Sequence, residues 1–341
     1  AALLAAVLLA VAWGGCGGGG AEPGASKDAT LILDFQPNAV HAGIYSALRR
    51  GYYADEGVRL HVRQPSDSTD APKLLRAGRA QFAILDIHDF MIARGKGFDV
   101  VAIAPIVQRP LAAVIARDRT AVRTPRDLEG KRVGVTGLPS DDAVLDSVLT
   151  ASGADLTRIK RVTIGFNAVA DLRAGKIDAA TAFWNAEGIA LERAGVPTRE
   201  FRVDSYGAPR YPELVLVTTG GLLHRNRSLA RAVALATARG YRLALAHPGR
   251  SLQDLLRSAS GLNRGEQSAQ LAALRQSKAF ESLASSRSAR VGVFEPQPVL
   301  RAIQWDVMHG IVRQRRIAPH LHGMFESVCE NETAAGKYGC F

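Results

Sequence analysis

Short apolar runs alternate with segments of helical spacing along most of the chain. The runs Leu31-Ile32-Leu33, 81–85 and 100–107 have the length of buried strands, and Gly95 and Gly97 end the helical segment before the last of them. Strands that alternate with helices predict a parallel sheet covered by helices on both faces. We therefore expect an α/β fold.

This alternation stops once and then starts again. A polar stretch follows the apolar run 112–116, a second series of strands and helices comes next, and the strong run 214–217 ends that series. Two series with a return predict two lobes, the second inserted into the first, with a ligand cleft between them. We place the lobes at 29–116 (first part of lobe 1), 117–211 (inserted lobe 2) and 212–325 (return to lobe 1 and C-terminal helices).

The first residues of the chain have the pattern of a targeting segment. The apolar stretch 1–13 is too short to span a membrane as a mature helix and resembles the core of an export signal. Small residues directly before Cys16 resemble a bacterial lipoprotein signal, cleaved before that cysteine and lipidated on it. We expect a signal at 1–16, a flexible tether at 17–28 and attachment to the membrane through the lipid. The alternative is a plain export signal in which Cys16 occurs by chance.

The remaining cysteines and the charge refine this picture. Cys329 and Cys340 are an isolated pair in an exported chain, which predicts a disulfide that pins the tail 326–341. The net charge of +11 comes from arginines spread along the chain, which favours a solvated surface over a nucleic-acid footprint. We expect a monomer in the periplasm or on the outer face of the cytoplasmic membrane.

One strand-to-helix junction gathers polar and aromatic side chains. The segment Asp34-Phe35-Gln36-Pro37-Asn38-Ala39-Val40-His41, called here the first motif, follows a strand-like run and leads into a helical pattern that contains Tyr45. Ligands of open α/β sheets bind at the carboxyl ends of strands. We therefore take Asp34, Phe35, Asn38, His41 and Tyr45 as candidate ligand-binding residues. The structural alternatives are a core role for Phe35, a helix cap for Asn38 and a surface position for His41.

Further candidates follow two other strand-like runs. Phe183-Trp184-Asn185-Ala186-Glu187-Gly188, called here the second motif, could supply an aromatic ring, an amide and a carboxylate. Trp184 could sandwich a flat ligand against Phe35, and stacking of this kind contributes about 0.5–1.5 kcal/mol. The candidates outside the first motif are Asp86, Asp89, Trp184, Asn185, Glu187, Tyr206 and Tyr211. Lobe packing, helix capping and a favourable place in a first helical turn are the alternative roles of these residues.

Several quoted segments, in their order and spacing, resemble the NMT1/THI5-like solute-binding proteins. Besides the two motifs they are Gly51-Tyr52-Tyr53, Pro65-Ser66-Asp67-Ser68-Thr69, 77–83 and 127–134, and the resemblance runs from about residue 30 to about 247. It implies a type II periplasmic-binding-protein fold, in which two α/β lobes, each a mixed or parallel sheet flanked by helices, are joined by two crossovers. A protein of this kind delivers a small molecule to an ABC importer. The membrane permease of that importer is the implied partner.

The resemblance also narrows the range of expected ligands. The best-understood branch of the family binds thiamin pyrimidine precursors, and other branches bind sulfonates and other small organic molecules. Asp34 and Glu187 could accept hydrogen bonds from the amine of a formyl- or hydroxymethyl-aminopyrimidine, and Asn38 could donate or accept. A sulfonate would instead need the helix start at Ser140, but Asp141 and Asp142 disfavour an anion there, so capping is the favoured role.

An enzyme of the same family is the rival hypothesis. Eukaryotic relatives that make the thiamin pyrimidine imply a first-motif histidine, which His41 matches, together with a Schiff-base lysine and a cysteine-rich run. Residues 81–95 contain no lysine and 207–214 contain no cysteine. Without the lysine amine, pyridoxal phosphate has no covalent anchor. We therefore expect no enzyme activity and no cofactor, and the spacing of the eight histidines predicts no metal site.

Overall fold

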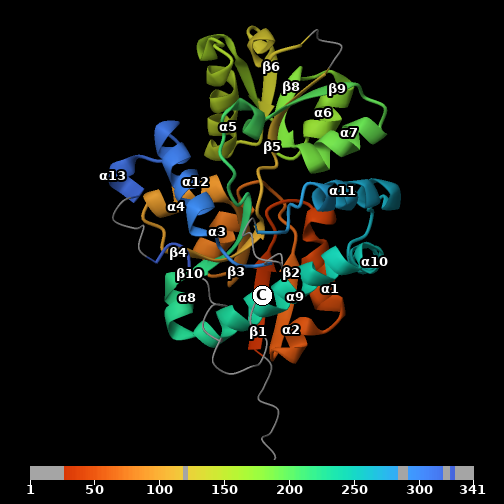
Figure 1. The fold of residues 1–341 in the computed structure, drawn as a ribbon, viewed down its shortest axis with the longest axis vertical. Helices are drawn as coiled ribbons and strands as arrows, with labels where there is room; N and C mark the ends of the chain where they lie inside the picture. Colours follow the sequence, from red (N-terminus) through yellow and green to blue (C-terminus); the bar gives the residue numbers. More distant parts are fainter. Residues whose placement is uncertain (1–26, 118–121, 283–290, 318–322, 327–341) are drawn as a thin grey trace, which may run out of the picture.

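A computed structural model describes residues 27–117, 122–282, 291–317 and 323–326 of the chain (Figure 1). The expected signal, the lipidation site Cys16, and Cys329 and Cys340 of the expected disulfide lie outside these residues. The first strand begins at Lys27, so the last two residues assigned to the tether belong to a sheet. Within the described residues, no helix combines the length and apolar character needed to cross a membrane.

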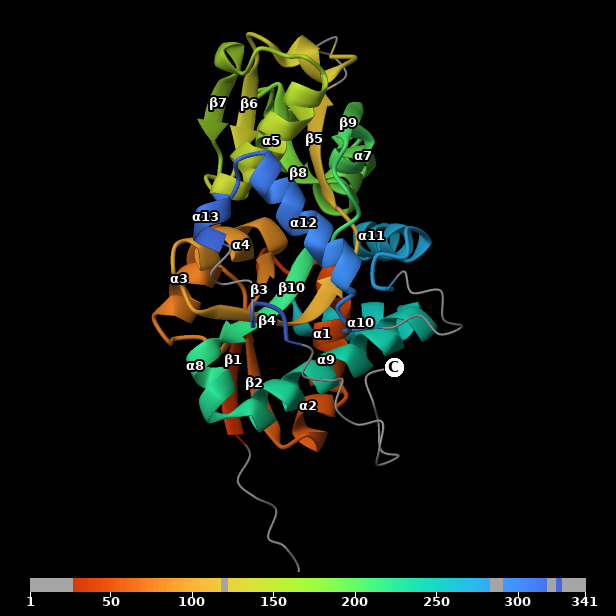
Figure 2. The same ribbon diagram turned by 60° about the vertical axis from the view of Figure 1, so that its left-hand side comes forward.

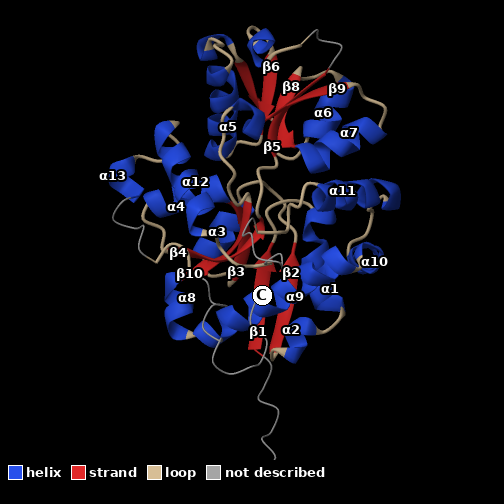
Figure 3. Cartoon of the chain, in the orientation of Figure 1, coloured by secondary structure: helices blue, strands red, loops and turns tan. Residues whose placement is uncertain are grey.

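Two five-stranded sheets form the centres of two lobes (Figure 3). The first sheet has the order β2-β1-β3-β10-β4, in which β10 runs antiparallel to both of its neighbours while β1 is parallel to β2 and β3. Its strands are β1 (Lys27–Ile32), β2 (Val58–Arg63), β3 (Phe82–Asp86), β4 (Val100–Val107) and β10 (Leu214–Thr219). Every residue of β4 is buried, as expected for a strand covered on both faces.

The second sheet has the order β7-β6-β8-β5-β9. Its strands are β5 (Ala112–Arg117), β6 (Arg132–Val135), β7 (Lys160–Thr163), β8 (Ala179–Phe183) and β9 (Thr198–Arg202). Strand β5 pairs antiparallel with β8 and β9, so the inserted lobe begins at this strand and not at residue 117 as we placed it. The chain passes between the sheets twice, at 108–111 and at 203–213. The expected two-lobed α/β architecture with mixed sheets is confirmed.

Helices cover both sheets and also the junction between them. The first lobe carries α1 (Ala42–Arg49), α2 (Tyr52–Asp55), α3 (Asp70–Arg76), α4 (Ile87–Gly95), α8 (Gly220–Arg225), α9 (Arg227–Ala246), α10 (Pro248–Ser258), α11 (Arg264–Gln276), α12 (Pro296–Met308) and α13 (Gln314–Ile317). The second lobe carries α5 (Pro139–Ala151), α6 (Ala168–Ala174) and α7 (Ile189–Arg193). Figures 1 and 2 show α11 and α12 beside the junction of the two lobes.

The packing of α1 against α9 holds the first motif in place. The backbones approach so closely that a Cβ atom on Gly240 would lie 2.0 Å from the carbonyl oxygen of Gly43. The next residue, Tyr241, is buried and donates a hydrogen bond from its hydroxyl to the Val40 carbonyl at 2.7 Å. The long helix α9 therefore fixes both the start of α1 and the motif that precedes it.

Helix α11 contacts segments from both lobes. The buried side chain of Gln270 accepts a hydrogen bond from the Ala39 amide at 3.5 Å and donates one to the Ala186 carbonyl at 3.4 Å. Ala39 belongs to the first motif and Ala186 to the second. One side chain thus joins the two motifs, which lie more than a hundred residues apart in the sequence.

Candidate ligand-binding cleft

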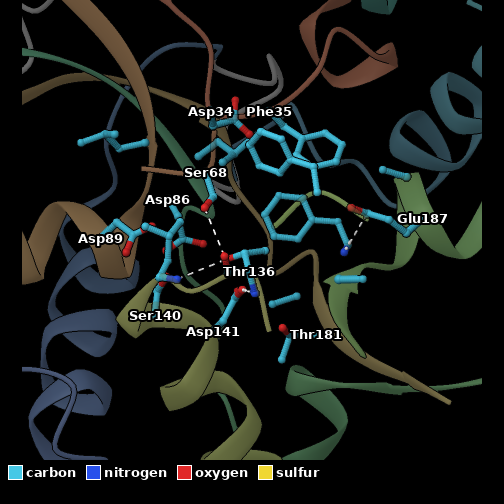
Figure 4. A pocket seen from close by; sticks show the side chains of 18 of the residues that line it. Asp34, Phe35, Ser68, Asp86, Asp89, Thr136, Ser140, Asp141, Thr181 and Glu187 are labelled. Carbon is cyan, nitrogen blue, oxygen red and sulfur yellow. Dashed lines mark hydrogen bonds between the residues drawn. The ribbon is translucent and has the colours of Figure 1, made fainter. Parts of the chain in front are cut away.

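A cavity between the lobes is lined by residues from both (Figure 4). Its volume is about 100 Å³, several times the 10–15 Å³ that one water needs on the same measure. The first lobe contributes the first motif, residues 68–72 and residues 84–89. The second lobe contributes 136–144, 165–168 and 181–187. A space of this size and place suits a small molecule.

The first motif is organised by hydrogen bonds within itself. The Asn38 side chain accepts a bond from the Val40 amide at 2.9 Å and caps a short 3₁₀ helix, η1 (Ala39–His41). The backbone amide of Asn38 donates a hydrogen bond to Nδ1 of His41 at 3.2 Å, so Nδ1 is the acceptor. Nε2 of His41 therefore carries the hydrogen that is donated to Asp34 at 2.9 Å. His41 is completely buried and does not line the cavity. It therefore orients Asp34, which does line the cavity.

Aromatic rings from opposite lobes meet in the cavity. Phe35 packs edge-to-face against Phe166, with 4.6 Å between ring centroids, and Phe183 also lines the space. The sandwich of Phe35 and Trp184 that we expected is not formed. The Trp184 ring is buried away from the cavity, donates from Nε1 to the Pro110 carbonyl at 3.2 Å and lies under the Arg202 guanidinium. Neighbouring side chains leave a strand on opposite sides, so Phe183 takes the place expected for Trp184.

The second motif forms one turn of π-helix, η5 (Trp184–Gly188), directly after β8. The Phe183 amide donates to the Glu187 carboxylate at 3.0 Å, and burial raises the pKa of Glu187 to about 7. Asn185 is fully buried and lines the cavity. Neither its amide nitrogen nor its amide oxygen has a hydrogen-bond partner among the described residues. A buried amide without partners is costly, so Asn185 stays a candidate for hydrogen bonds to a ligand.

Three aspartates line another part of the cavity, around the start of α5. Burial raises the pKa of Asp86 and of Asp89 well above the ordinary value, and the charge of Asp86 adds to the effect on Asp89. Asp141 accepts a hydrogen bond from the Thr136 amide at 2.7 Å, and burial raises its pKa as well. Figure 4 shows Asp86 and Asp89 beside Ser140, with Glu187 on the opposite side.

The ionisable side chains among the described lining residues are all acids. Five carboxyl groups line the cavity, and no lysine, arginine or histidine is found among the described lining residues; the acids are Asp34, Asp86, Asp89, Asp141 and Glu187. Such a surface favours a ligand that donates hydrogen bonds and disfavours a sulfonate. Asp86 also caps α4 by accepting from the His88 amide at 2.6 Å, so capping and lining are combined in this residue.

The three tyrosine candidates lie outside the cavity lining. Tyr45 is buried in the core beneath α1, because the helical period turns it away from the cavity. Tyr206 packs on Phe201 at 6.0 Å between ring centroids. Tyr211 is fully buried, with its ring 4.9 Å from His88. We therefore leave all three out of the proposed site.

Some lining residues were not among the sequence candidates. Phe166 and Thr136 follow strands of the second sheet, and Ser68 precedes α3; the Ser68 hydroxyl donates to the Thr136 carbonyl across the lobes at 3.2 Å. The rule that ligands bind at strand ends could have found Thr136 and Phe166, since Thr136 directly follows β6 and Phe166 lies three residues after β7. Ser68 belongs to a segment that carries the family resemblance, but nothing in that segment distinguishes it from its polar neighbours.

The two sheets, the two crossovers and the cavity between the lobes define the class of two-lobed solute-binding folds. Comparison with known sequences places the chain within that class. A sequence profile described as "NMT1/THI5 like" matches residues 38–251, and the chain belongs to this family.

Two curated relatives carry different names. The chain is 31% identical over 227 residues to the formylaminopyrimidine-binding protein of Halalkalibacterium halodurans, an alignment that covers 66% of this chain and 69% of the relative. It is 28% identical over 175 residues to the 4-amino-5-hydroxymethyl-2-methylpyrimidine phosphate synthase of Legionella pneumophila, covering 51% and 55%.

Among solved structures, the alkanesulfonate-binding protein SsuA of Xanthomonas axonopodis pv. citri superposes with a TM-score of 0.67. The match covers 86% of this chain and 98% of that one at 18% identity. This similarity shows the fold.

Proposed function

We propose that this protein is the exported solute-binding component of an ABC importer and that its ligand is a thiamin pyrimidine precursor. The ligand would be a formyl- or hydroxymethyl-aminopyrimidine, bound in the cavity between the lobes. The relative named for binding formylaminopyrimidine supports this ligand class. The import role rests on the family and on the two-lobed fold.

The observation that carries the proposal is the unpaired amide of Asn185. An aminopyrimidine presents an amine donor next to a ring-nitrogen acceptor, and a side-chain amide matches that pair with its own oxygen and NH₂, as asparagine does with adenine. Glu187, on the same turn of helix, would accept a further N–H. Phe35 and Phe166 would pack on the flat ring.

The lobes would close around this ligand. Residues from both lobes line the cavity, and the bond from Ser68 to Thr136 and the packing of Phe35 on Phe166 cross between them. A ligand that touches both lobes favours the closed form, because it binds that form more tightly than the open one. The permease would recognise the closed form.

The lipid anchor on Cys16 and the disulfide between Cys329 and Cys340 remain parts of the proposal.

The test is calorimetric titration of the purified protein with formylaminopyrimidine, hydroxymethyl-aminopyrimidine, thiamin and taurine. We expect saturable binding of the aminopyrimidines and none of taurine. A hundredfold excess over the dissociation constant should stabilise the protein by about 2.7 kcal/mol in parallel melting experiments. Binding of taurine alone would move the ligand class to sulfonates and contradict the role given to Asn185.

The enzyme alternative is supported by the relatives named as synthases, among them the Legionella pneumophila protein. The described part of the cavity lining contains no lysine that could hold pyridoxal phosphate. Incubation of the protein with pyridoxal phosphate should therefore give no Schiff-base absorption. Appearance of such a band, its loss when borohydride reduces the imine to a secondary amine, and mapping of that adduct to one lysine would favour the enzyme.

A further inference from the structure

Three possible metal ligands converge behind the acidic part of the cavity. Asp86 ends β3, His88 lies in the first turn of α4, and Glu213 directly precedes β10. One potential ligand atom from each residue lies within 4.8 Å of the other two. His88 and Glu213 are completely buried, while Asp86 also lines the cavity and so offers a path of entry.

Each of these side chains uses one polar atom to fix its orientation. Nδ1 of His88 is 2.6 Å from the carboxylate of Asp306 on α12. Oε2 of Glu213 accepts hydrogen bonds from the amides of Leu111 and Ala112, the latter at 3.1 Å. One oxygen of Asp86 accepts from the His88 amide. The second atom of each side chain is left for another partner.

One of those second atoms has no partner. Nε2 of His88 is buried and forms no hydrogen bond with any described residue. The carboxyl groups of Glu213 and Asp86 are hydrogen-bonded to each other, and the proton between them is one that a metal ion would displace. A histidine whose far nitrogen is held by a carboxylate is the usual arrangement around a protein-bound metal, because the carboxylate fixes the ring and its tautomer. One imidazole and two carboxylates suit a divalent cation such as Zn²⁺.

We propose that Asp86, His88 and Glu213 bind one divalent metal ion of the zinc type. The spacing of the histidines in the sequence predicts no such site, because the three ligands come from two segments more than a hundred residues apart and only one is a histidine. The ion would offset the charge of two adjacent carboxylates. Its remaining coordination positions would face the cavity, on the side that Asp86 lines.

The position would connect the ion to lobe movement. Glu213 lies in the second crossover, and its carboxylate holds the amides of Leu111 and Ala112 where the first crossover enters β5. Its backbone carbonyl also accepts from the Ile87 amide at 2.9 Å, beside His88. An ion bound to Glu213 would therefore stiffen the place where both crossovers meet.

The experiment is direct and needs no organic ligand, so it is independent of the proposed pyrimidine. The chelator-treated protein is titrated with Zn²⁺ in a calorimeter, and bound zinc is counted by elemental analysis after gel filtration. We expect one ion per chain. Co²⁺ in place of Zn²⁺ should give visible absorption bands that report nitrogen and oxygen ligands.

Variants separate this site from surface binding. Asp306→Asn keeps all three ligands but weakens the support of His88, so zinc affinity should fall about 10–100-fold. Glu213→Gln keeps an acceptor for the two crossover amides while removing the carboxylate, and should abolish stoichiometric binding in a protein whose circular dichroism is unchanged. His61→Gln is the matched control, since His61 is an exposed histidine 3.5 Å from Asp28.

Two results would overturn the proposal. One is the absence of bound zinc in the wild-type protein, which would leave a shared proton or an internal water between the carboxyl groups. The other is equal zinc binding by the wild type, Asp306→Asn and Glu213→Gln, with loss only in His61→Gln. Neither result would contradict the proposed pyrimidine site, because no organic ligand is used in this experiment.

Discussion

The first and second motifs both follow a strand and face the same cavity, yet their polar groups differ in hydrogen bonding. In the first motif, Asp34 is hydrogen-bonded to His41, and His41 in turn to the Asn38 amide. In the second motif, Asn185 has no partner among the described residues, and burial raises the pKa of Glu187. The polar side chains of the first motif are hydrogen-bonded within the motif, whereas the amide of the second motif is left without a partner.

On the proposed function, this difference separates residues that maintain the shape of the site from residues that would form hydrogen bonds to the ligand. A buried polar group that is already bonded contributes to a rigid local structure. One that is left unbonded lowers stability until a ligand supplies the bond. Mutations in the first motif should therefore mainly change stability, and mutations in the second should mainly change binding or its dependence on pH.

The largest effect should come from the charge buried in the second motif. The pKa of Glu187 is raised from 4.5 to about 7, so the native state holds a proton that the unfolded state releases. The free energy of unfolding therefore falls as the pH rises from 4.5 to 7, by up to about 3 kcal/mol in total, and stays lowered above 7. Glu187→Gln should be more stable than the wild type at pH 8 by about that amount and equal to it at pH 4.

Urea denaturation of the ligand-free protein at several pH values measures this difference. Glu187→Gln should also bind amine-bearing ligands more weakly, because an amide oxygen replaces a carboxylate. The exposed residue Glu192 provides the matched control, and Glu192→Gln should change neither property. Parallel pH curves for wild type and Glu187→Gln would show that Glu187 is not a buried acid.

The next effect concerns the unpaired amide. Asn185→Leu keeps the size of the side chain but removes both polar atoms, so an aminopyrimidine would lose two hydrogen bonds. Affinity should fall roughly 50-fold, about 2.3 kcal/mol, while the ligand-free protein becomes slightly more stable. Calorimetric titration and thermal melting measure the two quantities. Unchanged affinity would remove Asn185 from the site.

A smaller effect is expected in the first motif, where a mutation should change stability more than ligand affinity. His41→Leu leaves the Asp34 carboxylate and the Asn38 amide without their partner. The free energy of unfolding should drop by about 2 kcal/mol, more than the free energy of ligand binding does. Denaturant titration measures the first and calorimetry the second. A loss confined to binding would mean that His41 contacts the ligand itself.

The smallest effect tests the rings. Phe166→Leu removes an edge-to-face partner of Phe35, and affinity should fall by about 0.5–1.5 kcal/mol. Trp184→Phe removes the hydrogen bond to Pro110 outside the cavity, and should lower stability while leaving affinity within about twofold. If Trp184→Phe weakened binding more than Phe166→Leu, the ring first expected from the sequence would belong in the site after all.

The sequence pattern predicts much of the fold, because many strands and helix ends are specified by residues close to them in the sequence. Apolar runs flanked by turn residues place β1, β3 and β4, and glycines mark helix ends. The sheet to which β5 belongs is not predictable in this way. Its residues are apolar like those of any central strand, and only pairing with β8, more than sixty residues further on, puts it in the second sheet.

The site is predictable by segment but less well by residue. The strand-end rule leads to the segments that line the cavity, including Asp34, Asp86 and Glu187. It does not say which of two neighbours points inward, so Trp184 was expected where Phe183 lies. It also cannot show that the amide of Asn185 lacks a partner, because that depends on the three-dimensional surroundings of a buried side chain.

Strand β10 lies between β3 and β4, although it is synthesised more than a hundred residues after β4 ends. The second sheet has no such delay, because its five strands all fall between Ala112 and Arg202. Contacts between distant segments slow folding. Lobe 2 can therefore close its sheet early, while β3 and β4 remain without their shared neighbour until residue 219 is available. The cavity is lined by residues of β3 and β10, so its lining is complete only when β10 has joined the first sheet.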